Sequence, residues 1–431
     1  MASMKLANCK YCFSLPPLGH LPVLKSLSIK GFHAVSHVGR EFYGDGSSSA
    51  TNPFKSLKHL SFEDMPEWQE WFLFEDGNEG GVFSTLRELC IIKCPKLCRG
   101  LPNHLPSLAS LKINECQQLS ASLPKTPAVR SLELNHCDKV VLKELPPKLV
   151  SLCIGGPATS IEGITTLYYS SLEVLTIKGG CDSLWFFPLE FYTKLKYFFV
   201  YESQNLESLS VSEGSHQDLT SLAFLRISKC PNFVSFASGG LCAPNLTEIS
   251  IFDCKKLKSL PEGMHNLLPS LVFLHLNHCL ELESFPEGGL PSNLVTLNIS
   301  SCHKLFSRRM EWGLQALHSL RKFRVSISFE ELESFPEKAL LPPTLTNFTI
   351  YSFPNLKSLN EFQYLTSLQQ LDIEICDKLQ CLPKEGLPAS LSSLRLSGCP
   401  LLEKRCDREK GEDWPKIAHI PMIKIGDEVI N

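Results

Sequence analysis

Apolar residues recur in one short pattern along almost the whole chain. In residues 86–97, LRELCIIKCPKL, apolar and more polar residues alternate over Leu86–Ile91. Alternation with a period of two predicts a short strand with one buried face. The template, L-x-x-L-x-[IL]-x-x-C-x-x-L, returns in clear copies that begin at residues 86, 108, 129, 222, 246, 271, 294, 368 and 391, and in weaker copies at 24, 57, 149, 172, 195, 320 and 345.

The spacing of these copies is regular. Between Leu86 and Leu391 they start about every 23 residues, which is the period of leucine-rich repeats. Proline and glycine follow the cysteine in several copies, as in PEGGLP at 286–291, and exclude a regular helix there. We therefore predict an α/β solenoid: a leucine-rich-repeat horseshoe with a long parallel β-sheet on its concave face, a convex side of loops and 3₁₀ turns, and few helices.

The repeats set the expected domain limits. Residues 1–402 are expected to form a solenoid of about 16–17 repeats, with insertions near 39–53 and 65–83, and residues 403–431 a C-terminal cap or tail. The second insertion carries two tryptophans and five carboxylates, which fit either a packed loop over the sheet edge or a docking surface. Because the chain starts inside a partial repeat, we expect the physical domain to begin before Met1.

The cysteines follow the repeat. Ten of the eighteen occupy the same template position: Cys9, Cys94, Cys116, Cys137, Cys230, Cys254, Cys279, Cys302, Cys376 and Cys399. In this architecture the position is small and buried, so we expect a compact filler whose thiol donates weakly to nearby backbone. The spacings Cys9-x-x-Cys12 and Cys90/Cys94/Cys98 are compatible with metal, but the strand geometry points the latter three in different directions. We expect no metal site and free thiols in a reducing compartment.

Composition and motifs exclude several functions. The net charge is −3, hydrophobic residues make up 43% of the chain, and the N-terminus lacks an export signal, so neither nucleic-acid nor membrane-spanning character is expected. No G-x-S-x-G or H-E-x-x-H motif occurs, and no G-x-x-x-x-G-K-[ST] phosphate loop. We therefore expect no enzyme, no catalytic residues, no metal ligand and no cofactor, including ADP or ATP, in this chain.

Several phrases together resemble one protein family. These are SLPPLGHLPVLKSLSIKGFHAVSHVGREFYG near the start, FEDMPEWQEW, the C-P-K-L and C-D-K-L steps, and the closing EKGEDWPKIAHIP. They resemble the C-terminal leucine-rich-repeat region of plant coiled-coil nucleotide-binding (NLR) disease-resistance proteins, over essentially all of the chain. The resemblance implies an intracellular immune receptor in the cytoplasm, with the nucleus or the membrane periphery as further locations. Its repeats would sense a pathogen effector, or a guarded host protein, and restrain a nucleotide switch that this chain lacks.

Partner-binding residues are expected on the exposed strand positions. The template aligns Tyr197, Phe224, Glu248 and Phe273 in one column, Phe199, Arg226, Ser250 and His275 in the next, and Tyr201, Ser228, Phe252 and Asn277 in a third. Aromatic side chains and arginine are enriched in binding hot spots. The predicted surface is Tyr197, Phe199, Tyr201, Phe224, Arg226, Phe252, Phe273 and His275. The alternative is that the rings only stack across strands and stiffen the sheet.

Two further predicted strands carry charged residues. The sequence also leaves two other classes of protein as alternatives. Arg321, Lys322 and Arg324 would form a basic strand, and Asp372 and Glu374 an acidic one, either of which could orient a partner. An extracellular receptor ectodomain would instead show L-x-x-N-x-L-x-G-x-I-P repeats and an export signal. A stand-alone adaptor, decoy or truncated gene product is the main alternative to an immune-receptor module.

Overall fold

The computed structural model describes residues 2–44, 53–72, 82–99, 101–120, 124, 126–137, 139–140, 145–156, 171–179, 184–210, 218–236, 239–327 and 332–430. The chain divides into two compact units. Unit 1 comprises Met1–Trp185 and Phe191–Asn205, and unit 2 comprises Phe186–Glu190 and Leu206–Asn431.

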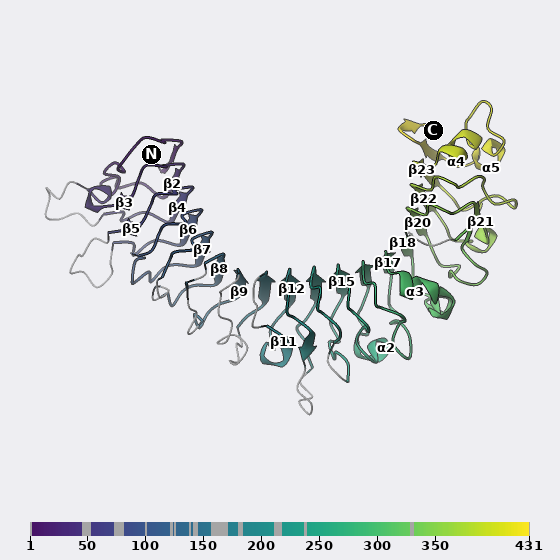
Figure 1. The fold of residues 1–431 in the computed structure, drawn as a ribbon, viewed down its shortest axis with the longest axis horizontal. Helices are drawn as coiled ribbons and strands as arrows, with labels where there is room; N and C mark the ends of the chain where they lie inside the picture. The colour runs from purple at the N-terminus through teal and green to yellow at the C-terminus, as the bar shows by residue number, and fades with distance from the viewer. Residues whose placement is uncertain are drawn as a thin grey trace. The chain divides into compact units, whose positions relative to one another are not determined.

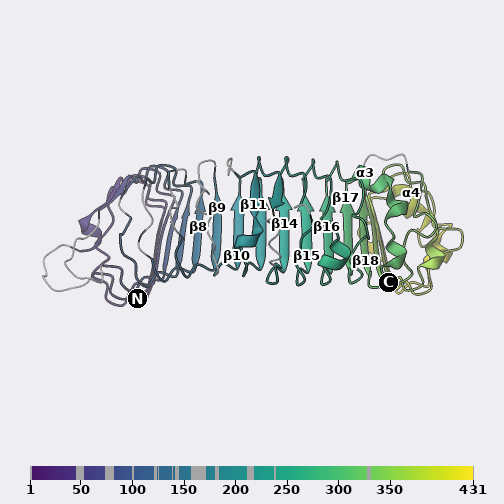
Figure 2. The same ribbon diagram turned by 90° about the horizontal axis from the view of Figure 1, so that it is seen from below.

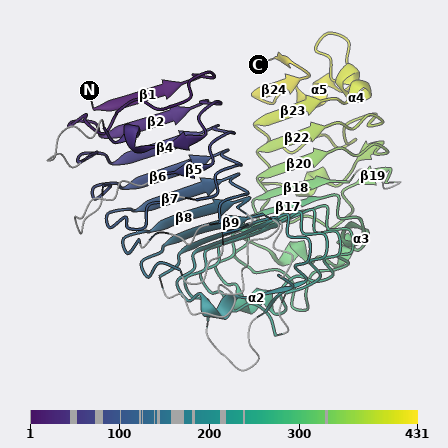
Figure 3. The same cartoon turned by 60° about the vertical axis from the view of Figure 1, so that its left-hand side comes forward.

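Unit 1 contains a ladder of five-residue strands in which each strand pairs with the next in parallel, as Figures 1 and 3 show. In order these are β1 (Ser3–Ala7), β2 (Ser26–Lys30), β4 (His59–Glu63), β6 (Glu88–Ile92), β7 (Ser110–Asn114), β8 (Ser131–Asn135), β9 (Ser151–Gly155), β10 (Val174–Lys178) and β12 (Tyr197–Tyr201). The two-residue strands β3 (His37–Val38) and β5 (Glu70–Trp71) form a separate pair, and η1 (Arg40–Phe42) is a 3₁₀ turn.

Unit 2 repeats this arrangement. Its parallel ladder runs through β14 (Phe224–Ser228), β15 (Glu248–Phe252), β16 (Phe273–Asn277), β17 (Thr296–Ser300), β18 (Lys322–Ser326), β20 (Asn347–Tyr351), β22 (Gln370–Glu374), β23 (Ser393–Ser397) and β24 (Met422–Ile425), and β25 (Glu428–Val429) joins β24 antiparallel. Strands β14 to β17 lie side by side in Figure 2.

Short elements complete unit 2 on the side away from this ladder. Two small parallel pairs are β11 (Phe186–Pro188) with β13 (Ser208–Ser210), and β19 (Ser334–Phe335) with β21 (Ser358–Leu359). The helices are α2 (Met264–Leu267), α3 (His303–Ser307), α4 (Pro400–Arg405) and α5 (Trp414–Ile417), with 3₁₀ turns η3 (Arg309–Glu311), η4 (Leu314–Ala316) and η5 (Phe362–Tyr364). The turn η2 (Leu189–Phe191) has residues in both units.

The strands alternate in burial as the sequence predicted. In β6, Leu89 and Ile91 are 1% and 0% exposed, whereas Glu88, Cys90 and Ile92 lie on the other side of the sheet, which we call the open face. Each repeat buries its leucine row only against the rows of its neighbours, which is the basis of solenoid stability. The predicted leucine-rich-repeat solenoid of parallel strands with few helices is therefore confirmed.

The ten cysteines at the shared template position, which we call the ladder cysteines, are small and mostly buried. Nine of the ten are buried, and Cys9 is half-buried. Each Sγ lies within hydrogen-bond distance of the carbonyl oxygen two residues earlier, from 3.3 Å in Cys302 to 3.8 Å in Cys9. The predicted role as filler and weak donor matches this geometry. All described cysteines are free thiols.

A residue with left-handed backbone conformation precedes each of these ten cysteines. Lys93, Glu115 and His136 have φ of 56°, 56° and 52°. The backbone N–H of each donates to the last carbonyl of the next strand, as from Lys93 to Asn114 O at 3.0 Å. For a residue with Cβ this conformation costs about 1–2 kcal/mol. Stacking of the repeats therefore stabilises the left-handed conformation, because residues with different side chains adopt it and make the same hydrogen bond.

The tryptophan-rich insertion is packed into unit 1. Trp68 and Trp71 are 0% and 1% exposed, and the Trp71 indole N–H donates to the Tyr43 hydroxyl at 2.8 Å. Burial raises the pKa of Tyr43. These tryptophans therefore belong to the core, in agreement with the packed-loop alternative. Residues 73–81, which hold three of the five carboxylates, and residues 45–52 of the first insertion lie outside the described residues.

The segment that follows β23 is held by a buried carboxylate. Asp413 is 1% exposed, and its oxygens accept hydrogen bonds from Arg405 Nε at 3.1 Å, Lys416 Nζ at 2.9 Å and the Leu382 N–H at 3.1 Å. Burial alone would raise the pKa of Asp413, but these hydrogen bonds outweigh it and hold the pKa below its usual value. The carboxylate thus links residues 405–416 to the repeat that contains Leu382.

Removing a ladder thiol should loosen the stack. Cys137 is 1% exposed, and its Sγ lies 3.3 Å from Ile113 O and 3.4 Å from Asn135 O. We expect Cys137→Ala to lower the free energy of unfolding by about 1–2 kcal/mol, because it removes buried volume and a donor. Urea unfolding followed by circular dichroism measures this. The exposed Cys12 provides the control Cys12→Ala, which should be nearly neutral. Equal effects of the two changes would contradict the packing role.

The Asp413 hydrogen bonds predict a pH-dependent stability. Because the folded pKa is lowered, the stabilisation is present above the unfolded pKa of about 3.9 and is lost as pH falls through the folded value. We expect Asp413→Asn to destabilise the protein by about 1–3 kcal/mol at pH 7. The difference from wild type should shrink as pH falls below about 4. Urea unfolding at pH 3 to 7 tests this, and a pH-independent difference would refute the assignment.

Candidate interaction surface

The strand alternation that buries the leucine rows also fixes which side chains reach the open face. The register in unit 2 aligns Phe224 with Glu248 and Phe273, and Arg226 with Ser250 and His275. A third column aligns Ser228 with Phe252 and Asn277. These columns of β14 to β16 are the ones that the template predicted.

The side chains of this region contact one another across the strands. The Arg226 guanidinium carbon lies 4.6 Å from the centroid of the Phe252 ring, in a cation–π arrangement. The Phe252 ring meets His275 edge to face at 4.5 Å, and Phe273 meets His275 at 6.2 Å. All four side chains are half-buried. We call Phe224, Arg226, Phe252, Phe273 and His275 the unit 2 cluster.

The imidazole at the centre of this cluster is neutral at pH 7. Burial and the positive charges of Arg226 and Arg324 lower the pKa of His275 to about 4. A neutral ring adds an uncharged hydrogen-bonding group between two aromatic rings. The cluster can therefore offer apolar contact and cationic donors to a partner on one rigid surface.

The other three predicted residues lie in unit 1, on β12. Tyr197 is 43% exposed, and the Phe199 and Tyr201 rings stack at 6.3 Å with an interplanar angle of 11°. Phe199 and Tyr201 also line a hollow of about 560 Å³, together with His136, Cys153, Thr176, Lys178, Gly179 and Glu202. The eight predicted residues thus form a cluster of five in unit 2 and a set of three in unit 1.

The predicted basic strand differs from the structure at Arg321. Arg321 lies before β18, and its guanidinium donates to the backbone carbonyls of His318 at 2.7 Å and Leu320 at 3.2 Å. The local backbone therefore holds Arg321 away from the open face. Lys322 and Arg324 lie on the strand and are exposed there. On β22, Asp372 and Glu374 both occupy open-face positions.

Sequence reasoning missed two features of the open face. Arg324 lies 5.1 Å from the centroid of the Tyr351 ring on the next strand. In unit 1, Glu133 accepts from Lys112, Asn114 and Asn135 at 2.9 to 3.0 Å. Both sets occupy template columns, so extending the column alignment beyond residues 197–277 would have found them.

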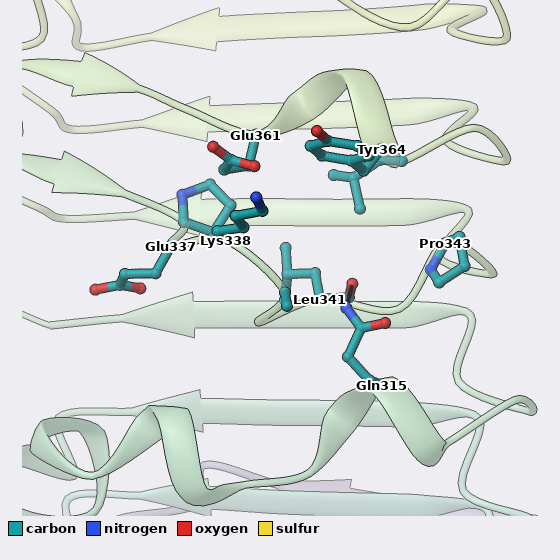
Figure 4. Close-up of a pocket in the computed structure, with 10 residues that line it drawn as sticks. Gln315, Glu337, Lys338, Leu341, Pro343, Glu361 and Tyr364 are labelled. Atoms are coloured by element: carbon teal, nitrogen blue, oxygen red, sulfur yellow. Dashed lines mark hydrogen bonds between the residues drawn. The ribbon is translucent and has the colours of Figure 1, made fainter.

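A separate hollow lies on the opposite side of unit 2. It has a volume of about 300 Å³ and includes Gln315, Leu341, Pro343, Glu361 and Tyr364 in its wall, as Figure 4 shows. The walls are mainly apolar, and the Gln315 amide donates to the Leu341 carbonyl. None of the predicted partner-binding residues borders this hollow. It offers room for a small apolar group.

Across the part of the chain that the structure describes, no group of three His, Cys, Asp or Glu side chains is placed to hold a metal ion. None of the helices formed by the described residues has the length and apolar character that crossing a bilayer requires.

Comparison with known proteins finds relatives along the whole chain. No protein-family model matches. A putative disease resistance protein of Arabidopsis thaliana is 28% identical over an alignment covering 100% of this chain and 45% of the relative. A putative disease resistance RPP13-like protein of the same plant is 31% identical over 59% of this chain and 21% of its own length. The putative disease resistance protein RGA4 of Solanum bulbocastanum is 54% identical over 12% of this chain and 6% of the relative.

Comparison with solved structures finds matches of low sequence identity. CroV588, described as a circular leucine-rich-repeat protein, has a TM-score of 0.43 at 15% identity and covers 88% of this chain and 63% of its own. YopM from Yersinia enterocolitica has a TM-score of 0.30 at 20% identity, and the match covers 84% of this chain and 78% of YopM. The present chain spans less than half the length of the plant relatives named above. Its described repeats form a leucine-rich-repeat solenoid, and the chain is similar over its whole length to a plant disease resistance protein, as its motifs indicated.

Proposed function

We propose that this chain is the protein–protein recognition module of an intracellular plant immune receptor. In this role it binds a pathogen effector or a guarded host protein, and it contacts a nucleotide-binding domain that it holds inactive. The module itself is not catalytic and binds no cofactor; ADP or ATP belongs to that other domain. The proposal places it in the cytoplasm.

The observation that carries the proposal is the contact geometry of the unit 2 cluster. Arg226, Phe252 and His275 form a continuous chain of contacts at 4.6 and 4.5 Å across β14, β15 and β16. Aromatic and arginine side chains that are already packed in the unbound protein lose little conformational freedom when a partner binds. The ring-stacking alternative accounts for the contacts but does not require an arginine among them.

The repeat architecture supports this role, because the residues that stabilise the fold and the residues on the open face are different ones. The buried leucine rows stabilise the stack, so the open-face residues can vary without loss of the fold. We further propose that residues 1–402 act as the solenoid and that 403–431 cap it, since β24 pairs with β23 and covers its edge.

Loss of the aromatic rings should weaken partner binding without unfolding the protein. Phe252→Ser with Phe273→Ser removes both rings that contact His275. We expect at least about tenfold weaker binding to a nucleotide-binding domain encoded by the same transcript, measured by calorimetry or co-purification. Circular dichroism should show an unchanged fold.

The matched control lies on the opposite side of unit 2. Tyr364 is 56% exposed and borders the hollow of Figure 4. Tyr364→Ser removes an aromatic ring of similar size and should leave binding unchanged. A loss of binding only with Tyr364→Ser would contradict the proposal. A transcript that lacks any in-frame phosphate-loop domain would instead support the adaptor or decoy alternative.

A further inference from the structure

The open face of β14 to β18 carries an unusual charge balance. These five strands are fully described and present fifteen side chains on that face. Arg226, Lys322 and Arg324 are cationic, and Glu248 is the one carboxylate among these fifteen. The chain as a whole has a net charge of −3. Positive charge is therefore concentrated on this part of the sheet.

Both arginines are oriented by an aromatic ring on the next strand. The Arg226 guanidinium carbon lies 4.6 Å from the Phe252 centroid, and that of Arg324 lies 5.1 Å from the Tyr351 centroid. A guanidinium that lies over a ring can also donate N–H groups from its edge to a carboxylate. The ring also reduces the entropy lost when the arginine is fixed by a partner.

The one carboxylate in this region is held within its own strand. The Ser250 hydroxyl donates to Glu248 Oε1 at 2.9 Å. On the neighbouring strands, the open-face residues around His275 are Glu248, Ser250 and Phe252 on β15 and Thr296, Asn298 and Ser300 on β17, and Glu248 is the one charged residue among these six. His275 is neutral, because burial and the two arginines lower its pKa to about 4. The electrostatic potential at His275 is therefore positive, because the charged groups that act on this imidazole are Arg226 and Arg324.

We infer that the open face of β14 to β18 binds an acidic, extended segment of a partner protein. Carboxylates of that segment would contact Arg226 and Arg324, and an apolar side chain would pack against Phe252 and Phe273. The inference rests on the proposed recognition function and specifies the chemistry of the partner. We call the open face of β14 to β18, together with Tyr351, the acidic-segment site.

The strand spacing sets the pattern of that segment. Arg226 and Arg324 occupy the same column four strands apart, which corresponds to about 19 Å at about 4.8 Å per strand. An extended chain advances about 3.3 Å per residue. Two carboxylates about six residues apart therefore reach both arginines, with the apolar residue between them.

Synthetic peptides test this pattern directly. The probe is a 12-residue peptide with two glutamates six positions apart and a phenylalanine between them. A second peptide has glutamine in place of both glutamates, and a third has the two glutamates adjacent. Fluorescence anisotropy with the full chain should show binding of the first peptide below about 1 mM and at least about tenfold weaker binding of the other two.

Two variants that remove the same charge distinguish binding at the two arginines from a non-specific attraction between opposite charges. Arg226→Gln with Arg324→Gln should weaken binding of the acidic peptide at least about tenfold. The control is Lys255→Gln with Lys258→Gln, which removes the same charge from exposed positions in the turn after β15. The control should change affinity by less than about twofold, because these lysines lie outside the open-face columns and salt screens exposed charges.

The imidazole supplies a readout that does not depend on affinity. A carboxylate on Arg226 or Arg324 offsets the positive charge that lowers the pKa of His275. Nuclear magnetic resonance of labelled histidine should therefore show this pKa rising from about 4 when the acidic peptide is saturating. The glutamine peptide should leave it unchanged.

Several outcomes overturn the inference. They are equal binding of the acidic and glutamine peptides, equal losses in the arginine and lysine variants, no binding at 1 mM, or equally tight binding of a single-stranded oligonucleotide. If these occur while Phe252→Ser with Phe273→Ser still weakens partner binding, the recognition function stands and the acidic chemistry is wrong. If the peptide results hold but those phenylalanine changes have no effect on a partner domain, the proposed recognition function fails.

Discussion

The structure depends on one constraint: a leucine row that no single repeat can bury. Strands such as β6 bury an alternating pair of side chains, here Leu89 and Ile91, only because the equivalent residues of the adjacent strands lie against them. The turn after the strand follows from this stacking. Its left-handed residue donates to the next strand, and the buried thiol beside it donates back to its own strand. Backbone pairing and packing therefore repeat with the same period.

This constraint leaves the open face available for recognition. Because stability comes from the buried rows, the three open-face positions of each strand can carry aromatic, cationic or polar residues without a cost to the core. In unit 2 the strand register then places Arg226, Phe252 and His275 in contact, although they are far apart in sequence. The same register places Arg324 over Tyr351. The recognition chemistry we propose thus follows from the repeat geometry.

The repeat pattern predicted much of the fold. The strands, their buried face, the parallel stacking and the role of Cys94 and its equivalents all follow from a template that repeats about every 23 residues. The left-handed turns could not be predicted from residue type, since lysine, glutamate and histidine occupy them equally. For the candidate site, the columns of β14 to β16 followed from the template, but side-chain contacts depend on rotamers that a template does not specify. Arg321 could have been placed from the alternation alone, because it directly precedes Lys322 and so does not share the face of Lys322 and Arg324. In the structure its guanidinium donates to the backbone carbonyls of His318 and Leu320.

We propose the open face of unit 2 as the recognition surface. The most direct test is a structure of this chain bound to a partner domain, at a resolution that shows side chains. We expect partner atoms in contact with Phe252, Phe273 and His275, and a carboxylate on Arg226 or Arg324. A partner seated instead on the opposite side of unit 2, against residues 336–365, with the open face of β14 to β18 exposed to solvent, would contradict it.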